Sequence, residues 1–223
     1  MNQTEASKTM FWHGSDSEEN YAKNPNKNSS STDITYKFNS HGFRTQEFDV
    51  NSVMPSILCL GCSFTMGTAL PIEQVWSSLL ADEFQNYNVY NLGVAGSSGD
   101  TIARILFQVA NKLNTKIVCI LWPEIHRYEI YRHDVFHTSA IGGPKIDPKL
   151  LIDDTHFTNL RYKNQAIVSL LQEKYKYDVI EFSTRCIVRV ENDFSRDAHP
   201  GPQTQKNIFH MFKEQIYKKS NYV

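Results

Sequence analysis

Apolar and polar positions alternate in blocks along most of the chain, and the blocks have two periods. Short, mainly apolar runs are typical of strands in a buried sheet: SILCL (56–60), VYNL (89–92), KIVCILW (116–122) and YDVIEF (177–182). Between and after them, apolar residues recur every three or four positions. This spacing predicts amphipathic helices over 72–84, from Asp100 as N-cap, over 157–174, and from about Pro202 to Lys219.

The helical spacing also predicts which side chains face the core. These are Val75, Leu79 and Leu80 in the first helix, Ile102, Ile105, Leu106 and Val109 in the second, Ile167, Leu170 and Leu171 in the third, and Ile208, Phe209, Phe212 and Ile216 in the last. Strands that alternate with helices imply right-handed crossovers and a mostly parallel sheet. The sequence therefore predicts an α/β domain.

The first 33 residues have no such pattern. Met1–Asp33 is polar and rich in Asn, Ser, Glu and Lys, which predicts a flexible or loosely docked arm ahead of one domain over 34–223. Phe11 and Trp12 are the exceptions and are candidate anchors of this arm. Residues 36–49 alternate aromatic and turn residues, which predicts an extended piece around a turn at His41 and Gly42.

Composition removes several classes of function. A formal charge of -1 over 223 residues argues against a general nucleic-acid binder. No apolar run approaches the roughly 18 residues of a membrane span, and MNQTEASKTM lacks a secretory pattern, so a cytoplasmic location is expected. Of four cysteines, Cys59 and Cys119 lie in apolar runs and are expected in the core; redox chemistry at the Cys59–Cys62 pair is a weaker alternative.

Three loops that follow strands carry the candidate chemistry: GCSFTMG, GVAGSSGDT and WPEIHR. Loops at the carboxyl ends of parallel strands meet at one edge of the sheet. Ser63 follows the first strand directly, so its hydroxyl and N–H are expected at that edge. In RDAHPGP, Asp197 and His199 are two positions apart, and such residues project to the same side of an extended loop. The pattern G-x-S-x-G fits poorly, because Thr65 replaces the second glycine.

Taken together, the loops resemble three blocks of the SGNH, or GDSL-type, esterase and lipase family. ILCLGCSFTMG resembles its first block, with Cys62 where Asp is usual; VYNLGVAGSSGDT resembles the second, and RDAHPGP the last. The resemblance extends from about Tyr36 to the last helix. It implies a flavodoxin-like three-layer α/β/α sandwich with a central, mostly parallel sheet.

The resemblance also implies a set of roles. Ser63 is then the nucleophile, His199 the general base and Asp197 its orienting partner, and the N–H groups of Ser63 and Gly96 bind the oxyanion. The expected activity is hydrolysis of an ester, an O-acyl or O-acetyl group on a small molecule, carbohydrate or lipid, with no cofactor.

One block of the family is missing. The third block, G-x-N-D, supplies an asparagine oxyanion donor, whereas this chain has LWPEIHRYE. Loss of such a donor typically costs about 2.7–4 kcal/mol of transition-state stabilisation. His126 and Arg127 are candidate substitute donors in this loop. The departure leaves open a weakened or inactive binding or structural protein on the same scaffold, and an acyltransferase is a third option.

Two other interpretations concern binding. The glycines of GVAGSSGDT can cradle a phosphate, but they match neither G-x-G-x-x-G nor the P-loop pattern. His126, His133 and His137 cluster in HRYEIYRHDVFH without metal-type spacing, so no metal is expected.

Overall fold

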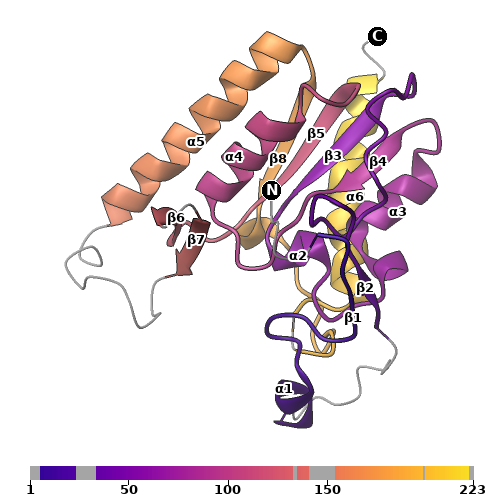
Figure 1. Ribbon diagram of the computed structural model, residues 1–223, viewed down its shortest axis with the longest axis vertical. Coiled ribbons are helices and arrows are strands. Elements are labelled where there is room, and N and C mark those ends of the chain that lie inside the picture. Colours follow the sequence, from indigo (N-terminus) through magenta and orange to yellow (C-terminus); the bar gives the residue numbers. More distant parts are fainter. Residues whose placement is uncertain (1–5, 24–33, 133–134, 141–153, 198, 221–223) are drawn as a thin grey trace.

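Four parallel strands form the central sheet of the computed structural model, which describes residues 6–23, 34–132, 135–140, 154–197 and 199–220 (Figure 1). The strands are β3 (Ser56–Gly61), β4 (Asn88–Asn91), β5 (Thr115–Trp122) and β8 (Asp178–Ser183). Their order is β4-β3-β5-β8. In this order β3, the first strand of the sheet in sequence, lies between the second (β4) and the third (β5), as it does in flavodoxin-like sheets. The predicted fold class and all four predicted strands are confirmed.

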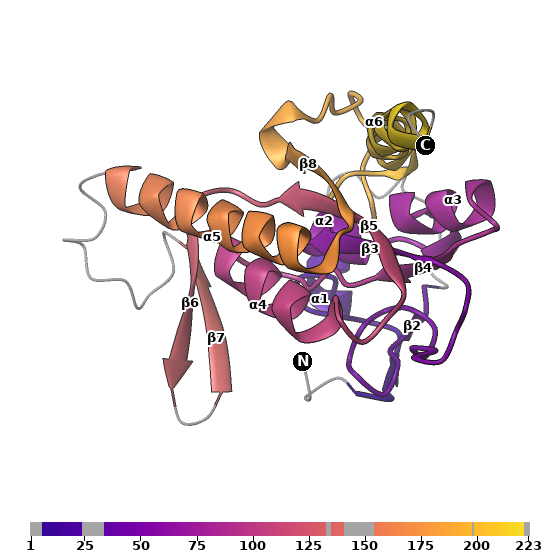
Figure 2. The ribbon, with the colours of Figure 1, turned by 90° about the horizontal axis from the view of Figure 1, so that it is seen from above.

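Helices cover both faces of the sheet (Figure 2). Helices α4 (Gly99–Val109) and α5 (Asp154–Tyr175) lie on one face, and α3 (Trp76–Glu83) and α6 (Pro202–Ser220) lie on the other. The short helices are α1 (Glu18–Lys23), α2 (Ser63–Met66) and the 3₁₀ turns Ile72–Gln74 and Thr184–Cys186. The layers are therefore helix, sheet, helix.

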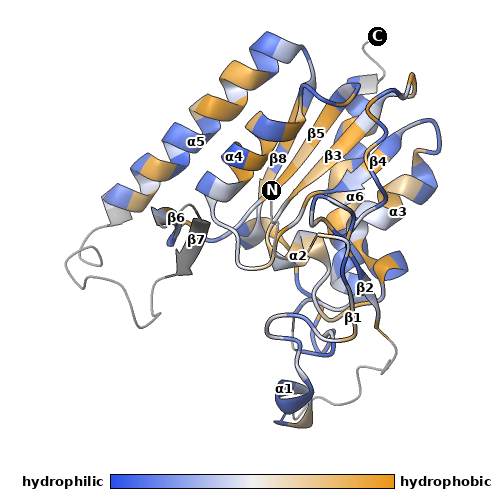
Figure 3. Ribbon diagram, viewed as in Figure 1, coloured by the Kyte–Doolittle hydropathy of each residue, from blue (hydrophilic) through white to orange (hydrophobic). Residues whose placement is uncertain are grey.

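The core is divided by the sheet into two apolar clusters, and the hydropathy colouring shows the apolar residues concentrated on the strands (Figure 3). Successive side chains of β3 point to opposite faces, and Ile57, Leu58, Cys59 and Leu60 are all fully buried. Cys59 and Cys119 lie in this core as free thiols, as predicted, and burial raises the pKa of both. The continuous apolar runs of the sequence are thus explained by burial on both faces.

Helix predictions needed three corrections. Val75 is extended, so the segment 72–84 divides into a 3₁₀ turn and α3. The N-cap of α4 is Ser98 and not Asp100: the Ser98 hydroxyl accepts from Thr101 N–H, and Ser98 N–H donates to the Thr101 hydroxyl, which forms a capping box. Leu170 is 66% exposed, because α5 turns Val168 and Leu171 toward the sheet.

An unpredicted hairpin follows the third strand of the sheet. Strands β6 (Arg127–Arg132) and β7 (Val135–Ala140) pair antiparallel in a stretch for which the sequence pattern predicts no strand or helix. Glu129 fastens the hairpin to α4: its carboxylate accepts hydrogen bonds at 2.8 and 2.7 Å from Arg104 and one at 3.1 Å from Thr101. Residues 141–153 lie outside the described residues.

Residues 6–23, which belong to the predicted polar arm, pack against the body of the protein. Strand β1 (Thr9–Met10) pairs with β2 (Tyr36–Lys37), and Asp16 is only 1% exposed. Residues 1–5 and 24–33 of the arm lie outside the described residues. No helix in the described ranges has the length and apolar character needed to cross a bilayer.

Candidate active site

Ser63 lies where the sequence predicts, at the carboxyl end of β3 and the start of α2. Cys62 precedes it in an extended conformation, and the Cys62 carbonyl accepts hydrogen bonds from Thr65 and Met66. The turn closes at Gly67, whose φ of 76° lies in the left-handed region that glycine adopts without strain. Ser63 is 6% exposed. The strand and the short helix therefore hold its hydroxyl in one position.

His199 joins Ser63 to Asp197. Its Nε2 lies 3.0 Å from Ser63 Oγ, and its Nδ1 lies 2.8 Å from Asp197 Oδ1. With the proton on Nδ1, the ring donates to the carboxylate and its Nε2 accepts from the Ser63 hydroxyl. Phe64 packs edge-on against the imidazole at 5.9 Å. A serine, a base and an orienting carboxylate are thus within hydrogen-bonding distance in series.

The loop that carries Asp197 and His199 is a tight turn. Ser195 N–H donates to the His199 carbonyl at 2.8 Å, and Gly201 N–H donates to the Asp193 carbonyl at 3.0 Å. The His199 N–H also donates to Asp197 Oδ1 at 3.2 Å. One intervening residue is therefore enough for the carboxylate to reach the imidazole of His199.

Four groups donate hydrogen bonds to the Asp197 carboxylate, which is 2% exposed. Oδ1 accepts from the ring and N–H of His199 and from Ser195 Oγ at 2.9 Å, and Oδ2 accepts from Ser15 Oγ at 2.8 Å. Burial raises the pKa of Asp197, but the hydrogen bonds and charge of His199, with the hydroxyls of Ser15 and Ser195, outweigh it and leave this pKa below its usual range. The carboxylate therefore stays ionised at neutral pH.

The loop after β4 lies beside the Ser63 turn. Val94 N–H and Ser97 Oγ both donate to the Gly61 carbonyl, at 3.1 and 2.9 Å. Gly96 has a φ of 74° and Gly93 lies so close to α2 that a Cβ on it would be 2.3 Å from Met66 N. Within the described residues, neither the Ser63 nor the Gly96 N–H has a hydrogen-bond acceptor. Their role as oxyanion donors stays a prediction.

The two candidate substitute donors lie after β5. The His126 ring packs edge-on against Phe157 of α5 at 5.3 Å, and Arg127 begins β6. Arg127 Nη1 is buried and has no hydrogen-bond partner among the described residues. Trp122, at the end of β5, is 1% exposed and donates its indole N–H to Glu181 at 2.8 Å. A role for His126 or Arg127 at the oxyanion stays a prediction.

No cluster of three or more metal-ligating side chains occurs in the parts of the chain that the structure describes. His133 and the side chain of His137, two of the three histidines considered in the sequence, lie outside these parts.

Asn91, which stands in the second motif, and Arg44 support the site, although the sequence pattern assigned neither of them a role. Asn91 donates to the Thr65 carbonyl at 2.7 Å and accepts from Gly93 N–H at 3.0 Å. Arg44 is 2% exposed and donates to the carbonyls of Gly67 at 2.6 Å and Leu70 at 2.9 Å, and burial lowers its pKa to about 10. Together Asn91 and Arg44 fix α2 and the loop behind it, which carry Ser63.

No family model matches the sequence, and no curated protein matches it. Solved structures with a similar fold include a lipolytic protein of the G-D-S-L family from Veillonella parvula, at 15% identity and a TM-score of 0.44, over 72% of this chain and 97% of that one. Another is the psychrotrophic esterase EstA from Pseudoalteromonas sp., at 18% identity and a TM-score of 0.44, over 74% of this chain and 98% of that one. A third is Est24, a carbohydrate acetylesterase from Sinorhizobium meliloti, at 15% identity and a TM-score of 0.40, over 74% of this chain and 99% of that one.

The G-D-S-L family named for the Veillonella protein is the family whose motifs the sequence resembles. At these identities the likeness concerns the fold, and the roles of individual residues rest on the geometry of the site.

Proposed function

We propose that this protein is a serine hydrolase that cleaves an O-acyl or O-acetyl ester through an acyl-enzyme on Ser63. The observation that carries the proposal is the hydrogen-bonded series Ser63–His199–Asp197 at the carboxyl edge of a parallel sheet. Such a series needs no cofactor to activate a hydroxyl, because the imidazole takes its proton.

In the first half-reaction, Ser63 Oγ attacks the ester carbonyl as its proton passes to His199 Nε2. Asp197 accepts the Nδ1 hydrogen bond and stabilises the imidazolium that forms. The N–H groups of Ser63 and Gly96 are the donors for the oxyanion. The C–O bond to the alcohol then breaks, and the proton on His199 passes to the departing oxygen.

In the second half-reaction, His199 takes a proton from water, which attacks the acyl carbon. Collapse of this tetrahedral intermediate releases the acid and returns the proton to Ser63. Two backbone donors without a third-block asparagine predict a slow enzyme, by a factor of roughly 10²–10³, unless His126 or Arg127 donates. A weakened, ligand-holding protein is the second candidate, and the sequence LWPEIHR is the observation that favours it.

A fluorophosphonate probe tests which side chain is the nucleophile. We expect the wild type to be labelled at Ser63, Ser63→Ala to remain unlabelled, and the matched variant Cys62→Ala to be labelled at the wild-type rate. The control is close, because Cys62 is adjacent in sequence and also buried. Labelling that persists in Ser63→Ala or is lost in Cys62→Ala would reject the assignment.

A further inference from the structure

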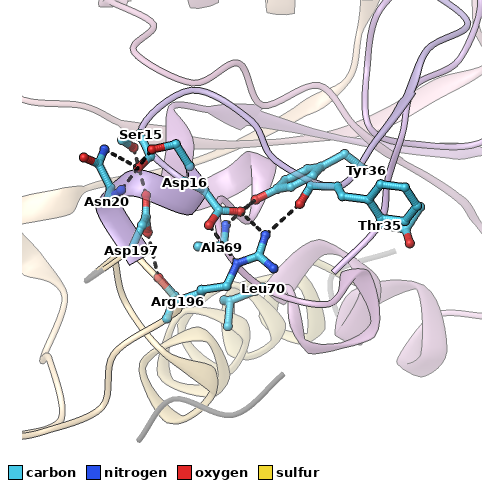
Figure 4. A network of polar contacts seen from close by, with 12 residues as sticks. Ser15, Asp16, Asn20, Thr35, Tyr36, Ala69, Leu70, Arg196 and Asp197 are labelled. Carbon is cyan, nitrogen blue, oxygen red and sulfur yellow. Dashed lines mark hydrogen bonds and ion pairs between the residues drawn. The ribbon is translucent and has the colours of Figure 1, made fainter. Parts of the chain in front are cut away.

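The N-terminal arm reaches the loop that holds the candidate triad. Figure 4 shows Ser15 and Asp16 of the arm beside Arg196 and Asp197. Ser15 Oγ donates to Asp197 Oδ2 at 2.8 Å, across 182 positions of sequence. The motifs that resemble the esterase family begin only at about Tyr36, so no motif predicts this contact.

Asp16 fixes the arm in this position. Its two carboxylate oxygens accept hydrogen bonds from Arg196 Nε at 2.8 Å and Nη2 at 2.6 Å, and the side chains of this ion pair are at most 1% exposed. Tyr36 adds a third bond, because its hydroxyl donates to Asp16 Oδ2 at 2.6 Å and accepts from Ala69 N–H at 2.6 Å. A bidentate, desolvated pair of this kind holds both partners in one geometry.

Arg196 receives two further contacts from the arm. Its guanidinium donates to the Phe11 carbonyl at 2.7 Å and lies 3.8 Å from the centre of the Trp12 ring. Arg196 is the residue immediately before Asp197. The arm therefore contacts the side chains of two consecutive residues, Arg196 and Asp197, at the same time.

Ser15 has a distinct place among the groups around Asp197. Oδ1 accepts from Ser195 and His199, whereas Ser15 is the one donor to Oδ2 in the described residues. A carboxylate held at both oxygens cannot rotate about its Cβ–Cγ bond. The Ser15 bond therefore keeps Oδ1 directed at the imidazole.

We infer that Ser15 is a positioning residue of the candidate triad and that the Asp16–Arg196 pair is the anchor that delivers it. This inference rests on the proposed function. Ser15 and Asp16 are thus part of the machinery of the site, although they lie in the polar arm. The guanidinium of Arg196 pairs with Asp16, and the imidazole of His199 pairs with Asp197.

Loss of the Ser15 hydroxyl has a predictable sign. The bond contributes to the lowered pKa of Asp197, so the carboxylate of a Ser15→Ala protein binds a proton more strongly. As the pH falls, the ionised form of Asp197 is therefore lost at a higher pH than in the wild type, and so is any activity that depends on it.

We expect Ser15→Ala to lower kcat for a short p-nitrophenyl ester about tenfold with little change in KM, because a hydrogen bond to a charged group is lost. Ser15→Thr keeps the hydroxyl and should restore most of kcat. Ser17→Ala is the matched control: its hydroxyl accepts from Asn20 N–H within the arm and has no bond to Asp197. Wild-type kcat and pH profile in Ser15→Ala would overturn the inference.

A second readout does not depend on hydrolysis. The proton between His199 Nδ1 and Asp197 is expected to give a low-field ¹H NMR signal in the wild type and in Ser17→Ala, and a shifted or lost signal in Ser15→Ala. This result with no ester hydrolysis by the wild type would reject the proposed function and keep the positioning role. An identical signal in all three proteins would reject the positioning role, whatever the rates.

Discussion

Ser63→Ala and His199→Ala should each lower kcat/KM for p-nitrophenyl acetate by about 10³-fold or more. The first variant has no nucleophilic oxygen, and the second has no base within reach of Ser63 Oγ. Initial rates of p-nitrophenol release over enzyme concentration measure the effect. Cys62→Ala serves as the control and should keep the wild-type rate.

The two substitutions remove one unit, so their effects should not add. The double variant Ser63→Ala/His199→Ala is expected to be no slower than Ser63→Ala alone. Equal background rates in the wild type and all variants would contradict the hydrolase and favour the ligand-holding alternative.

Asp16→Ala should lower the free energy of unfolding by about 3–5 kcal/mol, because it leaves the Arg196 guanidinium buried without its counter-charge. The Tyr36 hydroxyl loses its acceptor in the same variant. Urea unfolding followed by tryptophan fluorescence measures the change. A loss this large is expected only if the arm is docked as part of the folded domain.

Glu19→Ala is the matched control for this prediction. Glu19 lies on the same arm and pairs with Lys23, but both side chains are largely exposed, and exposed pairs contribute little to stability. We expect Glu19→Ala to have the same free energy of unfolding as the wild type. If Asp16→Ala has the same free energy of unfolding as Glu19→Ala, the buried pair does not hold the arm in solution.

The sheet and its helices were predictable because their signals are local. A strand that is buried on both faces is apolar along nearly its whole length, and the runs SILCL and KIVCILW therefore indicate such strands. The position of Ser63 followed from the same logic, since loops at the carboxyl ends of parallel strands converge. The roles of Asp197 and His199 came instead from the resemblance of RDAHPGP to a motif of the esterase family. Leu170 shows where this kind of prediction fails. The apolar stripe of its helix is wider than the face that packs on the sheet, and the sequence does not indicate which edge of the stripe is exposed to water.

Of the contacts made by the arm, only the anchoring by Trp12, which lies against Arg196, was predicted. The others could not be predicted, because they are not local. Asp16 and Arg196 are 180 positions apart, and in sequence Asp16 is one acidic residue within the polar run SDSEEN. A polar segment that is docked mainly through one buried ion pair can have the same amino-acid composition as a segment that is fully solvated. Only the folded structure distinguishes them.

The covalent intermediate tests the central claim most directly. Wild-type protein mixed with p-nitrophenyl acetate, quenched in acid and digested, should carry an acetyl group on Ser63 by mass spectrometry, and the group should disappear when the ester is removed before quenching. Hydrolysis of the ester with no acetyl group on Ser63, or with the group on Cys62, would contradict the claim.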